Sequence, residues 1–191
     1  MSVIMETRNR LHTAQDLIRL DAKGLRYELI EGEFQEMAPS GPTHGNATSR
    51  LSHYVGDHVY RSDLGETFAA ETGFLISRNP DTVLAPDLAF ILEDRLPAEF
   101  PAGYCTIVPD LVVETRSPGD SDLFVLEKTA RWLDAGVRLV WNVDPTSRTV
   151  SVHSAGQTAQ SLGATDVLDG GDVLPGFRLP VSNIFRAARA K

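Results

Sequence analysis

A buried strand that ends in an acidic residue constrains this chain more than any other stretch. The segment PDLVVETRSP, from Pro109 to Pro118, contains the apolar run Leu111–Val113, which is typical of a strand covered on both faces. The two prolines cannot continue a strand ladder and so bracket it. Glu114 follows the apolar run directly. A carboxylate buried there costs several kcal/mol unless a cation, a metal ion or hydrogen bonds compensate its charge.

A second apolar segment, VLAPDLAFIL from Val83 to Leu92, is interrupted by Pro86 and Asp87. We expect the two segments to be neighbouring strands that present Asp87 and Glu114 near the same edge. Carboxylate oxygens in such an arrangement can bind a divalent cation. Each acid also has a simpler interpretation, because an aspartate after proline often caps a turn and a glutamate at a strand end can point to water.

A helix is predicted after the Glu114 strand. The segment Gly119-Asp120-Ser121-Asp122 supplies N-cap residues, and Gly136 is a stop signal. Four apolar residues recur at helical spacing in between and are expected to be the buried face: Leu123, Leu126, Ala130 and Leu133. Lys128 flanks this face, so that its long side chain could reach the end of the strand.

Length and composition fit one globular domain spanning residues 1–191, with 42% apolar and 23% charged residues. No apolar run is long enough for a membrane span and the N-terminus has no signal-peptide pattern, so we expect a cytoplasmic protein without a membrane partner. The single cysteine, Cys105, excludes an internal disulfide and a cysteine-cluster zinc site. The net charge of −8 gives no general attraction for phosphate backbones.

Further acids lie in the first half of the chain. The segment YELIEGEFQEM, from Tyr27 to Met37, predicts a β-hairpin that turns at Glu31 and Gly32, with its acids on a solvated face: Glu28, Glu31, Glu33 and Glu36. The segment from Glu66 to Ser77 is predicted to be a single strand bent at Gly73. Glu71 falls in this strand and could join the acidic edge.

The order of these features resembles the Uma2 (DUF820) proteins, a bacterial branch of the PD-(D/E)XK restriction-endonuclease-like superfamily. The resemblance extends from YELIEGE (residues 27–33) through His44 and Gly65, the Pro-Asp pair, PDLVVE and WNVDP to DVLPGF (residues 172–177). It implies an α/β fold: a restriction-endonuclease-like core with a central mixed β-sheet flanked by helices and an N-terminal β-hairpin extension. It also implies that Asp87 and Glu114 are metal ligands.

The sequence departs from the superfamily pattern at position 116, where Arg116 stands in place of the usual lysine. Arginine stays protonated and can hold a phosphate, but it cannot take a proton from water. The catalytic lysine is therefore absent or supplied by Lys128. His44 matches a histidine of the family and could cap its helix, contact a phosphate or support the metal site. The superfamily often adds an acid from outside the two central strands, and Glu31 is the candidate that we select.

We therefore expect a Mg²⁺- or Mn²⁺-dependent nuclease that hydrolyses phosphodiester bonds, with Asp87, Glu114 and Lys128 as catalytic residues. The cation would be held by the two carboxylates and the backbone carbonyl of Thr115. DNA is the favoured substrate over RNA, and a symmetric homodimer would give an acidic subunit a composite surface for a polyanion. The alternative is a catalytically inactive binding or assembly module, since fold resemblance alone does not establish activity.

Overall fold

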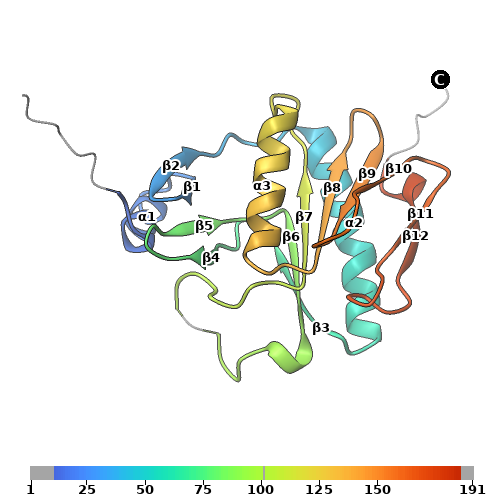
Figure 1. The fold of residues 1–191 in the computed structure, drawn as a ribbon, viewed down its shortest axis with the longest axis horizontal. Coiled ribbons are helices and arrows are strands. Elements are labelled where there is room, and N and C mark those ends of the chain that lie inside the picture. Colours follow the sequence, from blue (N-terminus) through green and yellow to red (C-terminus); the bar gives the residue numbers. More distant parts are fainter. Residues whose placement is uncertain (1–10, 101, 186–191) are drawn as a thin grey trace, which may run out of the picture.

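A six-stranded mixed sheet forms the centre of the molecule, which was analysed as a computed structural model (Figure 1). The structure describes residues 11–100 and 102–185. Neighbouring strands are antiparallel except β7 and β8, which are parallel and are connected through helix α3 (Asp122–Asp134). In spatial order the strands are β10 (Gln160–Leu162), β9 (Thr149–His153), β8 (Leu139–Asp144), β7 (Leu111–Thr115), β6 (Leu88–Leu92) and β3 (Gly65–Ala69).

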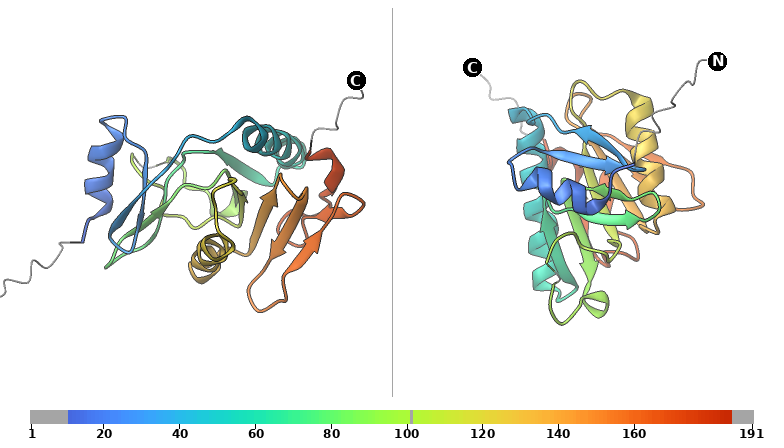
Figure 2. Two further views of the ribbon diagram at one scale, coloured as in Figure 1. Left: turned by 90° about the horizontal axis from the view of Figure 1, so that it is seen from above. Right: turned by 90° about the vertical axis from the view of Figure 1, so that its left-hand side faces the viewer.

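Helices α2 (Pro42–Arg61) and α3 cover opposite faces of this sheet (Figure 2). The side chains of β7 alternate accordingly: Leu111 and Val113 pack with the α2 cluster, and Val112 packs with the α3 cluster. All three are fully buried. A strand covered on both faces needs the continuous apolar run that the sequence shows.

A smaller sheet lies beside the first and carries the N-terminal hairpin. Helix α1 (Ala14–Asp21) packs on it and begins with a capping box, in which Thr13 and Asp16 satisfy each other's backbone N–H groups. The hairpin was predicted, and its turn at Glu31 and Gly32 has positive φ angles at both residues. The strand order is β2 (Glu33–Glu36), β1 (Tyr27–Ile30), β5 (Thr82–Leu84) and β4 (Phe74–Ser77).

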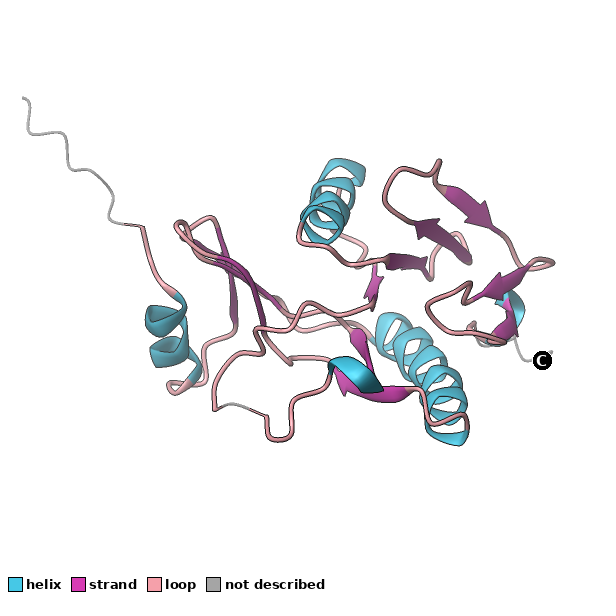
Figure 3. Cartoon of the chain, turned by 60° about the horizontal axis from the view of Figure 1, so that its bottom comes forward, coloured by secondary structure: helices cyan, strands magenta, loops and turns pink. Residues whose placement is uncertain are grey.

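The C-terminal part of the described chain adds a two-stranded sheet, β11 (Val167–Asp169) and β12 (Arg178–Pro180), to the α2 side of the core. Short 3-10 turns occur at Glu93–Arg95 and Val181–Asn183. Helix α1 and these last strands lie at opposite ends of the molecule (Figure 3). The α/β fold with a central mixed sheet, flanking helices and an N-terminal hairpin is therefore confirmed.

Each of two segments that were predicted as a single strand forms two separate strands. The segment 66–77 is not one strand bent at Gly73, because a turn containing Glu71 separates β3 of the large sheet from β4 of the small one. Glu71 has a φ of 74°, which is incompatible with a continuing strand. The segment 83–92 divides in the same way at Pro86 and Asp87, so that β5 and β6 belong to different sheets. At each of these two breaks the chain passes from one sheet to the other.

The predicted buried face of α3 is wrong except at Leu133, which is partly buried against the α3 cluster. Leu123 and Leu126 have 65% and 56% of their surface exposed, and Ala130 is exposed as well. The helix instead buries Thr129 and Trp132. Lys128 lies on this inner side, with only 13% of its side chain exposed. The lysine thus faces the sheets directly and does not have to reach around a flank.

Candidate active site

The structure brings Asp87 and Glu114 together where the two sheets meet. The antiparallel register pairs Leu88 with Val113, so the start of β6 lies beside the end of β7. The backbone N–H of Asp87 donates to the carbonyl of Val113 at 3.1 Å, and the N–H of Thr115 donates to Asp87 Oδ2 at 2.7 Å. Strand pairing therefore fixes Asp87 at the end of the Glu114 strand.

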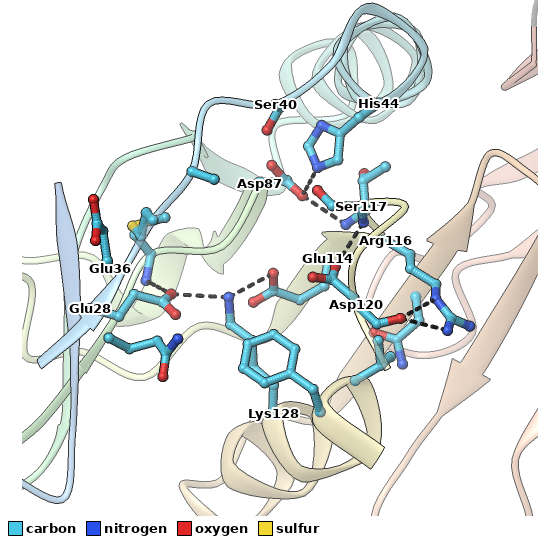
Figure 4. Close-up of a pocket in the computed structure, with 18 residues that line it drawn as sticks. Glu28, Glu36, Ser40, His44, Asp87, Glu114, Arg116, Ser117, Asp120 and Lys128 are labelled. Atoms are coloured by element: carbon cyan, nitrogen blue, oxygen red, sulfur yellow. Dashed lines mark hydrogen bonds and ion pairs between the residues drawn. The ribbon is translucent and has the colours of Figure 1, made fainter. Parts of the chain in front are cut away.

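Lys128 lies between two carboxylates (Figure 4). Its Nζ is 3.0 Å from Glu114 Oε2 and 3.0 Å from Glu28 Oε1. One helical turn later, Trp132 Nε1 donates to Glu114 Oε1 at 2.8 Å. The i, i+4 spacing places Lys128 and Trp132 on the same side of α3, where together they hold both oxygens of Glu114.

Glu28 is the site residue that the sequence interpretation missed, since we assigned it to a solvated face. The residue is only 3% exposed, and its Oε1 also accepts the N–H of Ala85 at 2.8 Å. Leu29 packs under α1, so Glu28 and Ile30 face the other way, and Ile30 packs with the α3 cluster. The sequence signal for the burial of Glu28 was therefore Ile30, because an apolar residue two positions later in a strand lies on the same face and indicates that this face is covered.

Burial and neighbouring charges both shift the pKa values of Glu114 and Lys128. Burial raises the pKa of Glu114 to about 7, against the effect of the Lys128 ammonium; the carboxylates of Glu28 and Asp87 raise it further. Burial alone would lower the pKa of Lys128, but Glu114 and Glu28 outweigh this effect and raise it above its usual range. Lys128 is therefore a permanent cation at neutral pH.

His44 lies in the first turn of α2 and faces Asp87. Its Nε2 is 3.3 Å from Asp87 Oδ2, and the residue is 7% exposed. Burial lowers the pKa of the imidazole, but the hydrogen bond to Asp87 and the charge of that carboxylate outweigh it and raise the pKa. The protonated imidazole of His44 is therefore favoured beside the Asp87 carboxylate, on the α2 side of the site.

The pKa directions predict how the stability of the cation-free protein changes with pH. The pKa of Glu114 is higher in the folded protein than in the unfolded chain, so stability is greatest where Glu114 is protonated and is lost as the pH rises through about 7. His44 contributes with the same sign, whereas His153, whose pKa is lowered by burial, contributes with the opposite sign. We expect the free energy of unfolding to fall by on the order of 2 kcal/mol between about pH 5 and pH 8.

Denaturant unfolding at several pH values measures this change, with Glu114→Gln as the matched variant. Glutamine resembles the protonated acid, so the variant should show a flatter dependence, which leaves the part that His44 and His153 contribute. An unchanged slope in Glu114→Gln would contradict the raised pKa of Glu114.

Arg116 lines the cavity, and its guanidinium contacts residues at the start of α3. Its guanidinium donates to the carbonyl of Asp120, at 2.7 Å from Nη2, and pairs with Asp122 at 2.6 Å. Asp122 is 83% exposed, so this ion pair can exchange with another anion. Thr115 lines the same cavity next to Arg116.

Two of the selected acids lie outside the site. Glu31 is in the hairpin turn with a side chain 70% exposed, and its nearest basic partner is Arg131 at 4.0 Å. Glu71 is in the turn between β3 and β4 and pairs with Arg26 at 2.6 Å. Neither lines the cavity, because a turn between strands points its side chains to solvent. The acid from outside the central strands is Glu28 instead.

The cavity has a volume of about 240 Å³ and is lined by Asp87, Glu114, Glu28, Lys128, His44 and Arg116, among others. Within residues 11–100 and 102–185, no group of three or more histidine, cysteine or acidic side chains lies in an arrangement that could hold a metal ion. The residue types nevertheless suit Mg²⁺ or Mn²⁺, because Asp87, Glu114 and Glu28 bring three carboxylates to the cavity and Lys128 pairs with only two of them, Glu114 and Glu28.

Comparisons with known proteins bear on the family and the fold of the chain. Residues 14–182 match the family model "Uma2: Putative restriction endonuclease". The fold is similar to the crystal structure of a "putative nuclease belonging to DUF820" from Anabaena variabilis, with a TM-score of 0.78 and 21% sequence identity over 91% of this chain and 97% of the other. No curated protein matches the sequence. In the described ranges, no helix is both long and apolar enough to cross a membrane.

Proposed function

The chain belongs to the Uma2 family, and from this we propose that it is a nuclease that hydrolyses phosphodiester bonds of nucleic acid with a divalent cation. The observation that carries the proposal is the buried lysine between Glu28 and Glu114, next to Asp87. A buried ion network at the wall of a polar cavity, with a strongly shifted carboxyl pKa, is a common property of catalytic sites.

Asp87, Glu114 and the carbonyl of Thr115 are the groups that would hold Mg²⁺ or Mn²⁺. When bound, the cation would polarise the phosphate and lower the pKa of a water molecule. Both carboxylates are oriented before a cation binds. Glu114 is held by Lys128 and Trp132. Asp87 is held by the Thr115 N–H and by His44. Ligands oriented in this way lose little freedom when they bind a cation.

Lys128 supplies a positive charge and does not act as a base. Its raised pKa keeps the ammonium protonated, so it can stabilise charge that develops on the phosphate in the transition state. This differs from the sequence-based reasoning, which selected a lysine for its ability to exchange protons with water. Arg116 would bind a phosphate oxygen of the substrate in exchange for the exposed Asp122.

Lys128 also bears on the alternative of an inactive binding or assembly module. The lysine missing at position 116 is compatible with that alternative, whereas the position of Lys128, 3.0 Å from Glu114, supports the proposal of an active site. We further propose a single domain that acts as a homodimer on DNA, since cutting both strands is commonly done by a symmetric pair.

Cleavage of nucleic acids under defined cation conditions tests the proposal. Duplex DNA, single-stranded DNA and RNA are incubated with Mg²⁺, Mn²⁺ or a chelator, and Asp87→Asn serves as the control. We expect cation-dependent cleavage, fastest on DNA, that is absent from the control. Intact substrates under all conditions, or equal cleavage by Asp87→Asn, would contradict the proposed function.

A further inference from the structure

Asn142 lies beside Glu114 in the wall of the same cavity. The parallel register pairs the two residues across β7 and β8, so their side chains lie on the same face of the sheet. Asn142 is 8% exposed. None of the roles assigned above uses this side chain.

The orientation of the Asn142 amide is fixed by hydrogen bonds. The hydroxyl of Thr129 has one hydrogen, which it donates to the carbonyl of Val125 at 2.7 Å. The hydroxyl oxygen must therefore accept from Asn142, and Nδ2 of Asn142 donates to it at 2.8 Å. The amide cannot be reversed without losing this bond. Oδ1 is therefore the amide atom that remains to accept from another donor.

Asn142 Oδ1 is buried and has no hydrogen-bond partner in the protein. A buried acceptor without a donor is costly and is usually satisfied by a water molecule or a ligand. The neighbouring carboxylate of Glu114 is also an acceptor, and its two donors, Lys128 and Trp132, both come from α3. Two acceptors that lie side by side call for a molecule with two donors between them.

Water is the smallest molecule with two donors. A cavity of about 240 Å³ has room for it, and a buried water molecule needs two to four polar partners, which Asn142 and Glu114 begin to provide. If the water molecule donates one hydrogen to each acceptor, both of its hydrogens are bound to residues that line the cavity. The lone pairs of the oxygen then face the open cavity, which is the orientation that a nucleophile requires.

We propose that Asn142 Oδ1 and the Glu114 carboxylate together hold one water molecule and orient it for attack on the phosphate. As the water oxygen bonds to phosphorus, the P–O bond to the leaving oxygen breaks, and the proton that the water donates to Glu114 passes to that carboxylate. The inference rests on the proposed hydrolysis and makes Asn142 a positioning residue. Asn142 acts through the water and not on the substrate. Its removal should therefore lower kcat and leave KM unchanged.

Three variants test this role. Asn142→Leu removes the acceptor at nearly the same volume, Thr129→Val removes the bond that fixes the amide, and Ser151→Ala is the matched control. Ser151 pairs with Asn142 from β9 but does not line the cavity. We expect about a 10²-fold loss of kcat for Asn142→Leu and a smaller loss for Thr129→Val. KM and Mn²⁺ affinity should stay unchanged in both, and Ser151→Ala should keep full activity.

A crystal structure at high resolution provides a readout that needs no cleavage. It should show an ordered water molecule within hydrogen-bond distance of Asn142 Oδ1 and Glu114 in the parent protein and not in Asn142→Leu. Absence of this water overturns the inference, as does an Asn142→Leu protein with full kcat. If the parent protein holds the water but cleaves nothing, the proposed hydrolysis has failed while the acceptor pair remains.

Discussion

Lys128→Ala is expected to lower the rate of the chemical step by roughly 10²-fold or more, the scale for losing one positioned electrostatic group. The structure places the Lys128 ammonium 3.0 Å from both Glu28 and Glu114, inside the cavity wall. Arg116→Ala is the matched comparison, because arginine is the residue at the usual lysine position. Arg116→Ala should act mainly on KM, since it removes binding of a phosphate oxygen.

Loss of Lys128 will also affect stability and must be separated from catalysis. Without the ammonium, Glu28 and Glu114 are two buried carboxylates without a cation, and breaking a buried ion pair costs about 3–5 kcal/mol. The pKa of Glu114 is already about 7, so this acid can take up a proton and reduce the cost. The double variant Lys128→Met with Glu28→Gln should regain stability, because it restores the volume and removes one charge.

Single-turnover cleavage by the double variant separates the two effects. A folded protein with normal thermal unfolding and a rate at least about 10²-fold below the parent would support the role of Lys128. A folded double variant that cleaves at the parental rate would show that the catalytic lysine has been assigned wrongly.

The central strands could be predicted because their sequence pattern has few other solutions. The apolar run Leu111–Val113 between two prolines fits a strand covered on both faces, and Asp87 follows a proline that ends one apolar segment and precedes another. The proximity of Asp87 and Glu114 followed from pairing those two strands. The pattern did not reveal that β5 and β6 belong to different sheets, because proline and aspartate can equally mark a bulge.

The roles of Glu28 and of the inner face of α3 were missed for a common reason. Helical spacing offered the apolar set of Leu123, Leu126, Ala130 and Leu133, and this set is largely exposed. The true inner face includes a lysine, which periodicity assigns to solvent. A lysine is buried there only because Glu114 and Glu28, from two different sheets, neutralise it. Such compensation depends on tertiary contacts that a local pattern does not contain.

The second large effect is expected for the two carboxylates proposed to hold the cation. Asp87→Asn and Glu114→Gln should each abolish Mn²⁺ binding while leaving the fold intact, because each removes one of the two proposed carboxylate ligands. Asparagine at position 87 can still accept the N–H of Thr115 through its amide oxygen. Glutamine at position 114 resembles the protonated acid that burial already favours, so the cation-free variant should be at least as stable as the parent near neutral pH.

Mn²⁺ titration by isothermal calorimetry of the parent protein, Asp87→Asn and Glu114→Gln tests this site most directly. The cation is measured without substrate, and thermal unfolding of the same samples confirms that all three proteins are folded. We predict saturable binding to the parent protein and no detectable binding to either variant. Binding to a variant as tight as to the parent would show that its carboxylate is not a ligand, and a parent protein that binds no Mn²⁺ would contradict the cation site altogether.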